Sequence, residues 1–244
     1  MSEMDRRGFV KAGLAVLAGT ALGNGITLFQ ARAEDGQDKA KTRWGLVIDA
    51  NKCGEKCSEC VNACRTENNV PLFGDPRYDG HWIRKATITP ENVEGGKSTS
   101  LPLLCNHCEH PPCKHVCPTA ATFVRHDGIV LIDKHRCIGC RYCMVACPYK
   151  ARTFVFKNSE AWPNPDVPKR SKGVVEKCTF CAHRLDKGQT PACVEACTKS
   201  GEGAMIFGNL NDPQSEIHRY IKENAPHGLR EDFGLKPKVL YKGV

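Results

Sequence analysis

The chain has 244 residues, of which 16 are cysteine, and its formal net charge is +8. Cysteine at this density indicates disulfides, zinc or iron–sulfur chemistry, because so many free thiols would be an oxidative liability. The positive charge does not indicate nucleic-acid binding, since it is spread along the chain and thiolate-ligated clusters would bring compensating negative charge.

The first 33 residues have the features of a twin-arginine export signal. Arg6 and Arg7 precede an uncharged stretch at residues 12–29, and residues 31–33 read Ala-Arg-Ala, a cleavage pattern. The stretch contains four glycines and is marginal beside the ~20 apolar residues that a spanning helix needs. We therefore expect cleavage before Glu34 rather than a retained anchor. The twin-arginine pathway carries folded proteins, so a periplasmic or extracytoplasmic location is expected.

The sixteen cysteines fall into four groups of four. In chain order these are Cys53-x3-Cys57-x2-Cys60-x3-Cys64, Cys105-x2-Cys108-x4-Cys113-x3-Cys117, Cys137-x2-Cys140-x2-Cys143-x3-Cys147 and Cys178-x2-Cys181-x11-Cys193-x3-Cys197. The third group, followed by proline, is the C-x2-C-x2-C-x3-C-P run of bacterial ferredoxins, and the other groups widen one of its loops. Three cysteines within seven residues let a loop wrap three corners of a 4Fe-4S cube, and Gly139 permits the tight path.

The fourth cysteine of each group lies one helical turn beyond the third. In two-cluster ferredoxins this cysteine ligates the other cluster. Disulfide bonding does not require this repeated cysteine spacing, and zinc ribbons usually carry two separated C-x2-C pairs. The spacing favours four 4Fe-4S clusters over the alternative of a disulfide- or zinc-stapled secreted structural protein.

Short strands are expected around the cysteine groups. Residues 47–53 and 131–137 form an internal repeat that predicts a strand feeding a cluster loop. Strands are also predicted at residues 122–124, 153–156 and 204–207. The predicted fold class is α+β and loop-rich, with two ferredoxin-like 4Fe-4S units related by pseudo-twofold symmetry, small β-sheets and short helices.

The C-terminal region carries one helix signal. Asp212 is the predicted N-cap and Pro213 the first helical residue of a helix that runs towards Asn224. Residues 225–244 show no helical period, so we expect them either to wrap a partner or to form a solvated end.

Side chains other than cysteine give no sign of a substrate site. Four histidines lie within the cysteine groups, but the cysteines already fill every cluster corner, so these histidines are expected at the surface or behind the ligands. They are His107, His110, His115 and His183. Basic residues beside the groups could raise cluster potentials or meet a partner, although a solvated position is the simpler expectation. They are Lys52, Lys56, Lys114, Arg136, Arg141 and Lys177.

No C-x2-C is followed by histidine, so covalent haem is not expected, and neither flavin nor zinc is expected. A phosphate-binding glycine loop, a nucleophile triad and an open metal site are likewise not evident. The sequence therefore predicts an electron carrier without a catalytic site of its own.

The four groups in this order resemble the four-cluster iron–sulfur subunits of dimethyl sulfoxide reductase and polysulfide reductase type complexes (NrfC/PsrB/DmsB-like), over roughly residues 43–210. The resemblance includes the motif Cys178-Thr179-Phe180-Cys181-x2-Arg184-x3-Gly188-x2-Pro191-Ala192-Cys193. Within the family, residues 103–108, 136–141 and 173–178, with the export signal, are most similar to the DsrO group, the periplasmic iron–sulfur subunits of DsrMKJOP membrane complexes of sulfur metabolism. The chain departs from the family in the extra residue of its first group and in Thr198, where a proline often follows the last cysteine.

The resemblance implies cross-ligation between the first and fourth groups and between the second and third. The implied ligand sets are Cys53, Cys57, Cys60 and Cys197; Cys178, Cys181, Cys193 and Cys64; Cys105, Cys108, Cys113 and Cys147; and Cys137, Cys140, Cys143 and Cys117. It also implies a domain arrangement: residues 43–102 and 157–210 form an outer unit with insertions, residues 103–156 a central unit, and residues 211–244 a C-terminal helix and partner-docking tail.

Its implied function is electron transfer between a quinone-interacting membrane subunit of the NrfD or DsrP type and a redox partner. In a DsrMKJOP complex that partner would be a periplasmic multihaem cytochrome. The alternative is the iron–sulfur subunit of a molybdopterin-containing polysulfide, tetrathionate or dimethyl sulfoxide reductase. Attachment to the membrane is expected through partners, and no nucleic acid is expected.

Overall fold

The computed structural model describes residues 42–89 and 98–244, so the predicted export signal at residues 1–33 lies outside the described part of the chain. Both described ranges belong to the same compact unit. Within them no helix combines the length and the apolar character that crossing a membrane would require.

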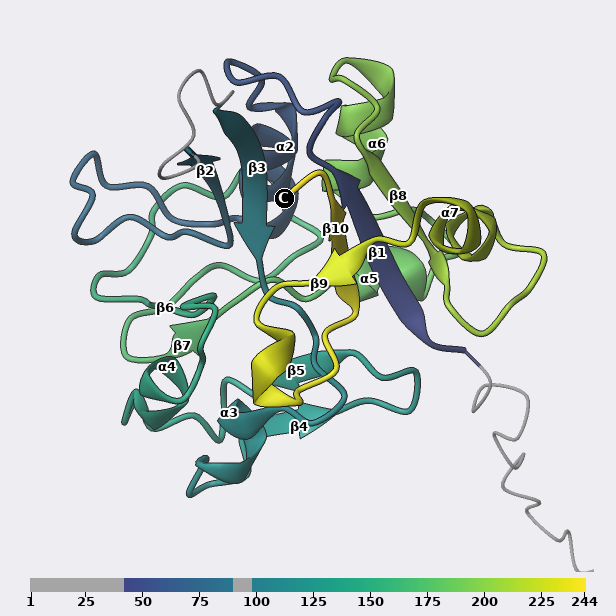
Figure 1. Ribbon diagram of the computed structural model, residues 1–244. Coiled ribbons are helices and arrows are strands. Elements are labelled where there is room, and N and C mark those ends of the chain that lie inside the picture. The colour runs from purple at the N-terminus through teal and green to yellow at the C-terminus, as the bar shows by residue number, and fades with distance from the viewer. Residues whose placement is uncertain (1–41, 90–97) are drawn as a thin grey trace, which may run out of the picture. The chain divides into compact units, whose positions relative to one another are not determined.

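The largest sheet has four strands in the order β8-β1-β10-β9 (Figure 1). Strand β1 (Trp44–Asp49) pairs antiparallel with β8 (Met205–Asn209) and parallel with β10 (Val239–Lys242), which in turn pairs antiparallel with β9 (His227–Gly228). Residues 46–48 are at most 1% exposed. This continuous apolar run is buried because β1 is an interior strand, paired along both edges, and packs against helix α7 (Glu216–Asn224).

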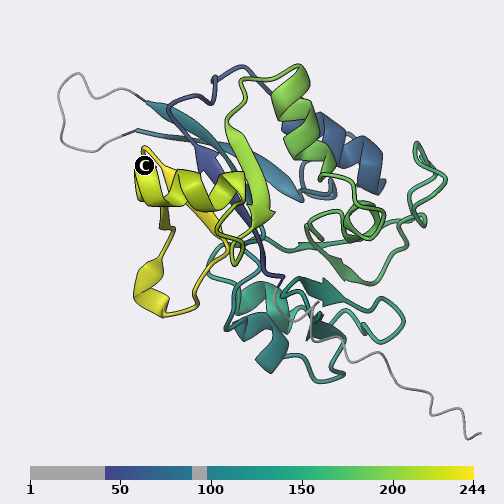
Figure 2. The same ribbon diagram turned by 90° about the vertical axis from the view of Figure 1, so that its right-hand side faces the viewer.

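Three longer helices cover this region. Helix α2 (Glu59–Asn68) packs against α6 (Ala192–Lys199), and α7 (Glu216–Asn224) packs against β8 and β1 (Figure 2). Ile217 of α7 is completely buried, and a Cβ atom on Gly208 would lie 2.8 Å from its Cγ2 atom. The absence of a side chain at Gly208 therefore lets the helix approach the sheet closely.

The start of α7 differs from the sequence prediction. The N-cap is Ser215, whose hydroxyl accepts a hydrogen bond from the His218 N–H at 3.3 Å, and the helix begins at Glu216. Asp212 instead accepts a hydrogen bond from the Gln214 N–H at 2.9 Å within the preceding turn. Asp and Ser are both favourable N-cap residues, and in the folded protein the N-cap is Ser215.

The remaining elements are short and lie mostly in the lower part of Figure 1. The two-stranded sheets are β2 (Ile83–Ile88) with β3 (Thr99–Leu104), β4 (Thr122–Val124) with β5 (Val130–Ile132), and β6 (Thr153–Phe154) with β7 (Val175–Glu176). The short helices are α3 (Pro112–His115), α4 (Tyr142–Val145), α5 (Ala182–Leu185) and the 3-10 turn η2 (Glu231–Phe233). These short elements joined by loops confirm the predicted α+β, loop-rich class, whereas the predicted domain boundaries stay a prediction.

Three cysteine groups share a local backbone conformation. The residue before the second cysteine has a positive φ in each, at 42° for His107, 70° for Gly139 and 52° for Phe180. A left-handed residue also stands three positions after two of the last cysteines, at Ala120 and Lys150. Repeated left-handed residues at equivalent positions indicate that the groups are copies of one loop design.

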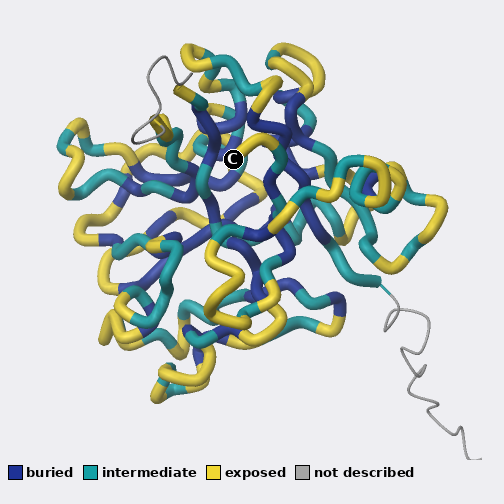
Figure 3. The backbone as a smooth tube through the Cα atoms, in the orientation of Figure 1, coloured by how far each residue is buried: buried dark blue, intermediate teal, exposed yellow. Residues whose placement is uncertain are grey.

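The buried residues form two hydrophobic clusters, and dark blue segments run through the interior of Figure 3. The larger cluster includes cysteines of the first and fourth groups together with β1 and β10 residues. The smaller cluster joins Cys113 of the second group to Cys143 of the third, with Val130 and Val175 between them in the packing. Cysteine side chains therefore occupy core positions in both clusters.

The end of the chain is part of this core. Val239 and Tyr241 of β10 are completely buried. Before β10, the Lys238 N–H donates to the Asn106 carbonyl at 2.9 Å and the Glu109 N–H donates to the Lys236 carbonyl at 3.0 Å. The tail therefore ties the second cysteine group to the main sheet. The expectation of a solvated end is wrong for Val239 and Tyr241, whereas a partner-docking role of residues 211–244 stays a prediction.

Candidate metal centres

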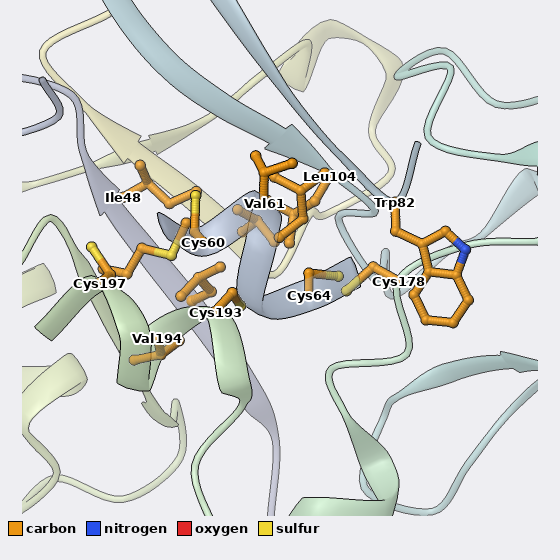
Figure 4. Close-up of a cluster of buried hydrophobic side chains, with 14 of the residues drawn as sticks. Ile48, Cys60, Val61, Cys64, Trp82, Leu104, Cys178, Cys193, Val194 and Cys197 are labelled. Atoms are coloured by element: carbon orange, nitrogen blue, oxygen red, sulfur yellow. The ribbon is translucent and has the colours of Figure 1, made fainter. Parts of the chain in front are cut away.

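All sixteen cysteines lie within the described residues, and all are free thiols. Two helices present cysteines in pairs four residues apart, Cys60 and Cys64 on α2 and Cys193 and Cys197 on α6. Side chains at this spacing share one helix face. Because α2 packs against α6, the two pairs face each other across the helix interface (Figure 4).

The first set of neighbouring thiols, set A, consists of Cys53, Cys57, Cys60 and Cys197. Burial raises the pKa of Cys60 to about 12, and Cys197, Cys53 and Cys57 add to the shift. Burial also raises the pKa of Cys53, where Cys57 and Cys197 again act in the same direction. The fourth cysteine of the last group therefore lies with the first three cysteines of the first group.

Set B consists of Cys64, Cys178, Cys181 and Cys193, all of which are buried. Burial raises the pKa of Cys64 well above its ordinary value, and Cys178, Cys193 and Cys181 raise it further. Figure 4 shows Cys64 and Cys178 beside each other near Trp82. The structure thus brings one cysteine of the first group to three of the fourth.

Set C consists of Cys105, Cys108, Cys113 and Cys147. Burial raises the pKa of Cys108 to about 12, with Cys105, Cys113 and Cys147 contributing in that order. Set D consists of Cys117, Cys137, Cys140 and Cys143. Burial raises the pKa of Cys143, and Cys137 and Cys117 add to it.

A cavity lies at set D and is lined by all four of its cysteines, together with Gly139, Arg141 and residues of β4, β5 and β7. A Cβ atom on Gly139 would lie 2.3 Å from the carbonyl oxygen of Gly173, so this loop closes against the β7 segment only with glycine at the position. A cavity walled by four thiols matches the donor set of a 4Fe-4S cube. Within residues 42–89 and 98–244, no group of three or more Cys, His, Asp or Glu side chains is arranged to hold a single metal ion.

Raised thiol pKa values have a simple consequence for these sites. A buried thiolate without a cation is costly, whereas a coordinating metal deprotonates the thiol outright. Cys117 differs, because burial is outweighed there by hydrogen bonds from the backbone at Thr122, Thr119 and Ala121, which lower its pKa. The nine thiols with raised pKa values, which occur in all four sets, are thus placed where positively charged metal would stabilise the folded protein.

Several polar groups point at the sulfur atoms. The Lys85 Nζ atom lies 3.4 Å from the Cys53 Sγ atom, the Asn68 Nδ2 atom lies 3.5 Å from that of Cys181, and the Ala204 N–H donates to Cys197 at 3.2 Å. Hydrogen bonds to ligand sulfur stabilise added negative charge and so raise the reduction potential of a cluster. Of these contacts, sequence analysis anticipated none.

The four sets follow one another in the order A, B, C, D. Cys60 of set A is among the groups that raise the pKa of Cys193 in set B. After burial itself, Cys105 of set C is the largest cause of the raised pKa of Cys178 in set B. Sets C and D meet through Cys113 and Cys143, which share the smaller hydrophobic cluster.

The junction of sets B and C contains two buried groups. Lys177 is 2% exposed, and its ammonium donates to the Cys178 carbonyl at 2.8 Å and to the Val130 carbonyl. His107 is fully buried, stacks on Phe180 at 3.8 Å between ring centroids and accepts a hydrogen bond from the Val130 N–H. Lys177 is therefore buried, with its ammonium at the Cys178 carbonyl, and the expected solvated position is wrong for it.

The other three histidines are at least partly exposed. His183 pairs with Glu67 at 2.7 Å, and His110 and His115 are exposed. Among the predicted basic residues, Arg141 lies over the Phe154 ring at 4.4 Å, Arg136 is 65% exposed, and Lys52, Lys56 and Lys114 are exposed.

Exposure rises towards one end of the series. Cys140 of set D is the exposed cysteine of the sixteen. Beside it in the same loop and helix, Ile138, Tyr142 and Val145 are 67%, 62% and 87% exposed. Exposed apolar side chains gathered at one site indicate an interaction surface.

Comparison with known proteins gives consistent relatives. The 4Fe-4S dicluster domain family matches residues 97–210. The chain is 46% identical to the Hdr-like menaquinol oxidoreductase iron–sulfur subunit 1 of Archaeoglobus fulgidus, over 98% of this chain and 97% of the relative. It is 36% identical to a subunit of tetrathionate reductase from Salmonella typhimurium, over 99% and 89%, and 34% identical to protein NrfC of Escherichia coli, over 81% and 79%.

Proposed function

This chain belongs to the ferredoxin-type iron–sulfur subunits of the NrfC/PsrB/DmsB-like family, and we propose that it relays electrons through four 4Fe-4S clusters held by sets A to D. Members of the family are electron-transfer subunits of reductase complexes and are not the catalytic subunits. When bound, the clusters supply saturated one-electron centres, which need no substrate pocket.

One observation carries the proposal. Each of the four sets combines three cysteines of one group with the last cysteine of a distant group, as the neighbours of Cys60, Cys64, Cys108 and Cys143 indicate. Isolated sites of any other metal would not need this exchange. Cross-ligation couples two clusters through each short helix, which is how two-cluster ferredoxins hold their centres close together.

The order of the sets supports a linear path. Set B is buried throughout, sets A and C contain partly exposed cysteines, and set D contains the exposed Cys140. An accessible set at one end suits a relay, because electrons can enter or leave where a partner docks. The protein part of the mechanism is therefore to fix the sets in sequence and to keep water from set B.

The two ends differ in character and so support different partners. The surface at set D exposes the apolar Ile138, Tyr142 and Val145, beside the charged Arg136 and Arg141, and suits an integral membrane subunit of the NrfD or DsrP type. The surface at set A carries the exposed Lys52 and Lys56 and suits a water-soluble redox protein. That partner would be a periplasmic multihaem cytochrome or, in the alternative complex, a molybdopterin catalytic subunit.

For the specific complex we propose a DsrO-like role in a DsrMKJOP-type assembly. The motifs at residues 103–108, 136–141 and 173–178 support it. The 46% identity to the menaquinol oxidoreductase relative, over 98% of this chain, supports a quinol-linked complex. Residues 6 and 7 support delivery to the periplasm by the twin-arginine pathway.

Iron and acid-labile sulfide analysis of anaerobically purified full-length protein tests the cluster assignment. We expect about sixteen iron atoms per chain and a brown chromophore that dithionite bleaches. About four zinc atoms per chain without the chromophore, or disulfides without metal, would end the proposal. Copurified subunits would then distinguish a quinol-linked complex from a molybdopterin reductase.

A further inference from the structure

Arg152 is a buried cation at the junction of sets C and D. It follows the loop after Cys147, directly before β6, and is 6% exposed. Its Nη1 atom donates to the hydroxyl of Thr122, the first residue of β4, at 3.3 Å. Its Nη2 atom is buried and has no hydrogen-bond partner among the described residues.

The hydrogen bond to Thr122 brings the guanidinium to both sets, because Thr122 lines the cavity of set D together with Cys143, and its strand β4 contacts helix α3, which carries Cys113. Burial raises the pKa values of Cys113 and Cys143, and in both cases Arg152 is the leading group that opposes the shift. A guanidinium is not deprotonated in proteins, so Arg152 carries a positive charge.

No carboxylate neutralises this charge within the described residues, since none of their ion pairs includes Arg152. A buried guanidinium without a counter-ion is costly. Arg170, the other buried arginine, has Glu176 as a partner at 3.4 Å. The anionic groups within reach of Arg152 are the sulfur ligands, which become thiolates when the sets hold metal.

We propose that Arg152 is the positioning residue that raises the reduction potentials of the clusters of sets C and D together, a role that rests on the proposed function. Each reduction adds one electron to a cluster, and the fixed positive charge beside Cys113 and Cys143 stabilises that added charge. No proton moves. One side chain thus keeps two neighbouring centres close in potential.

The test is a potentiometric titration, followed by electron paramagnetic resonance, of full-length protein loaded with iron. R152Q should lower the midpoint potentials of the clusters of sets C and D by about 59 mV or more. This shift corresponds to about a tenfold change in the equilibrium constant of a one-electron reduction. The potentials at sets A and B should stay unchanged. R152K keeps the positive charge but replaces the planar guanidinium by an ammonium, so the same two potentials should shift by less.

Arg136 provides the matched control, because it precedes Cys137 but its side chain is 65% exposed and pairs with Asp133. R136Q removes the same charge where solvent screens it, so its effect should be much smaller. Four unchanged potentials in R152Q at wild-type iron content, or shifts equal to those of R136Q, would overturn the proposal while leaving the electron relay intact.

If R152Q fails to load iron, R152M, which also removes the charge but leaves a side chain of similar length, decides. A downward shift confined to the clusters of sets C and D supports the proposal, and no shift or a shift of all four refutes it. Wild-type protein without clusters would instead refute the proposed function itself.

Discussion

Replacing Gly139 by alanine should remove the cluster of set D and leave the other three. Gly139 has a φ of 70°, and a Cβ atom there would lie 2.3 Å from the Gly173 carbonyl oxygen. Ordinary contact between such atoms is about 3.4 Å or more, so the two backbone segments must separate by roughly 1 Å. The left-handed conformation adds about 1–2 kcal/mol for a residue with a Cβ atom.

The separation acts directly on a ligand, because Cys140 follows Gly139 in the same loop. Cluster ligation tolerates little displacement, so we expect Gly139→Ala protein to hold about twelve iron atoms instead of about sixteen. Iron analysis gives the loss, and electron paramagnetic resonance of the reduced protein identifies the missing centre through its coupling to the neighbouring one.

Gly188→Ala is the matched control. Its φ is 72°, but a Cβ atom there would meet nothing within 4 Å. This variant therefore carries only the conformational cost and should keep all four clusters. If Gly139→Ala retained every cluster and unfolded at the same temperature as Gly188→Ala, the close approach to Gly173 would not constrain the site.

Three further predictions test separate parts of the structure. Cys147→Ser should disturb the cluster of set C and spare that of set D, as seen by resonance spectra of the reduced protein; damage to set D instead would make each cysteine group a self-contained site. Replacing Arg6 and Arg7 by lysine should leave cluster-loaded precursor in the cytoplasm by cell fractionation, and unchanged periplasmic delivery would contradict the export signal. Burial alone would raise the pKa of Asp49, but hydrogen bonds, among them one from the Tyr220 hydroxyl at 2.7 Å, lower it. Tyr220→Phe should therefore reduce the free energy of unfolding by about 1 kcal/mol near pH 7. Its deficit in a denaturant titration should shrink as pH falls below about 4, where the carboxyl becomes protonated; a deficit independent of pH would show that the hydroxyl does not act through this carboxylate.

Local patterns predicted the short elements well. The strand at residues 122–124 is observed as β4, and the strand predicted at residues 153–156 is observed over Thr153–Phe154. The predicted strand at 204–207 runs over Met205–Asn209. Cysteine spacing is equally local, because the same loop must wrap each cube.

What the sequence could not predict depends on contacts between distant residues. Strand β10 pairs with β1 although nearly the whole chain separates them. Four residues of alternating burial leave no distinctive local signal, so the tail was interpreted as solvated or as bound to a partner.

Arg152 was missed for a similar reason. Most of the basic residues singled out by sequence stand next to cysteines, whereas Arg152 is brought to sets C and D by a tertiary contact with Thr122, 30 residues earlier. Its one sequence signal is a single charge before the apolar run at residues 153–156. Lys177 does adjoin a cysteine, but its burial depends on the carbonyl of Val130, which lies 47 residues earlier.

The position of β1 between β8 and β10 has a consequence for biosynthesis. A ribosome releases the residues of sets C and D as one continuous stretch, 105–147, so this part of the protein can take up its iron while translation continues. Strand β1 and the first cysteine group must wait for Cys197 and then for β10 at Val239–Lys242. Maturation of the segment that emerges first therefore finishes last. A chain truncated before β10 should accordingly form the clusters of sets C and D and leave the first cysteine group in an open, protease-sensitive segment.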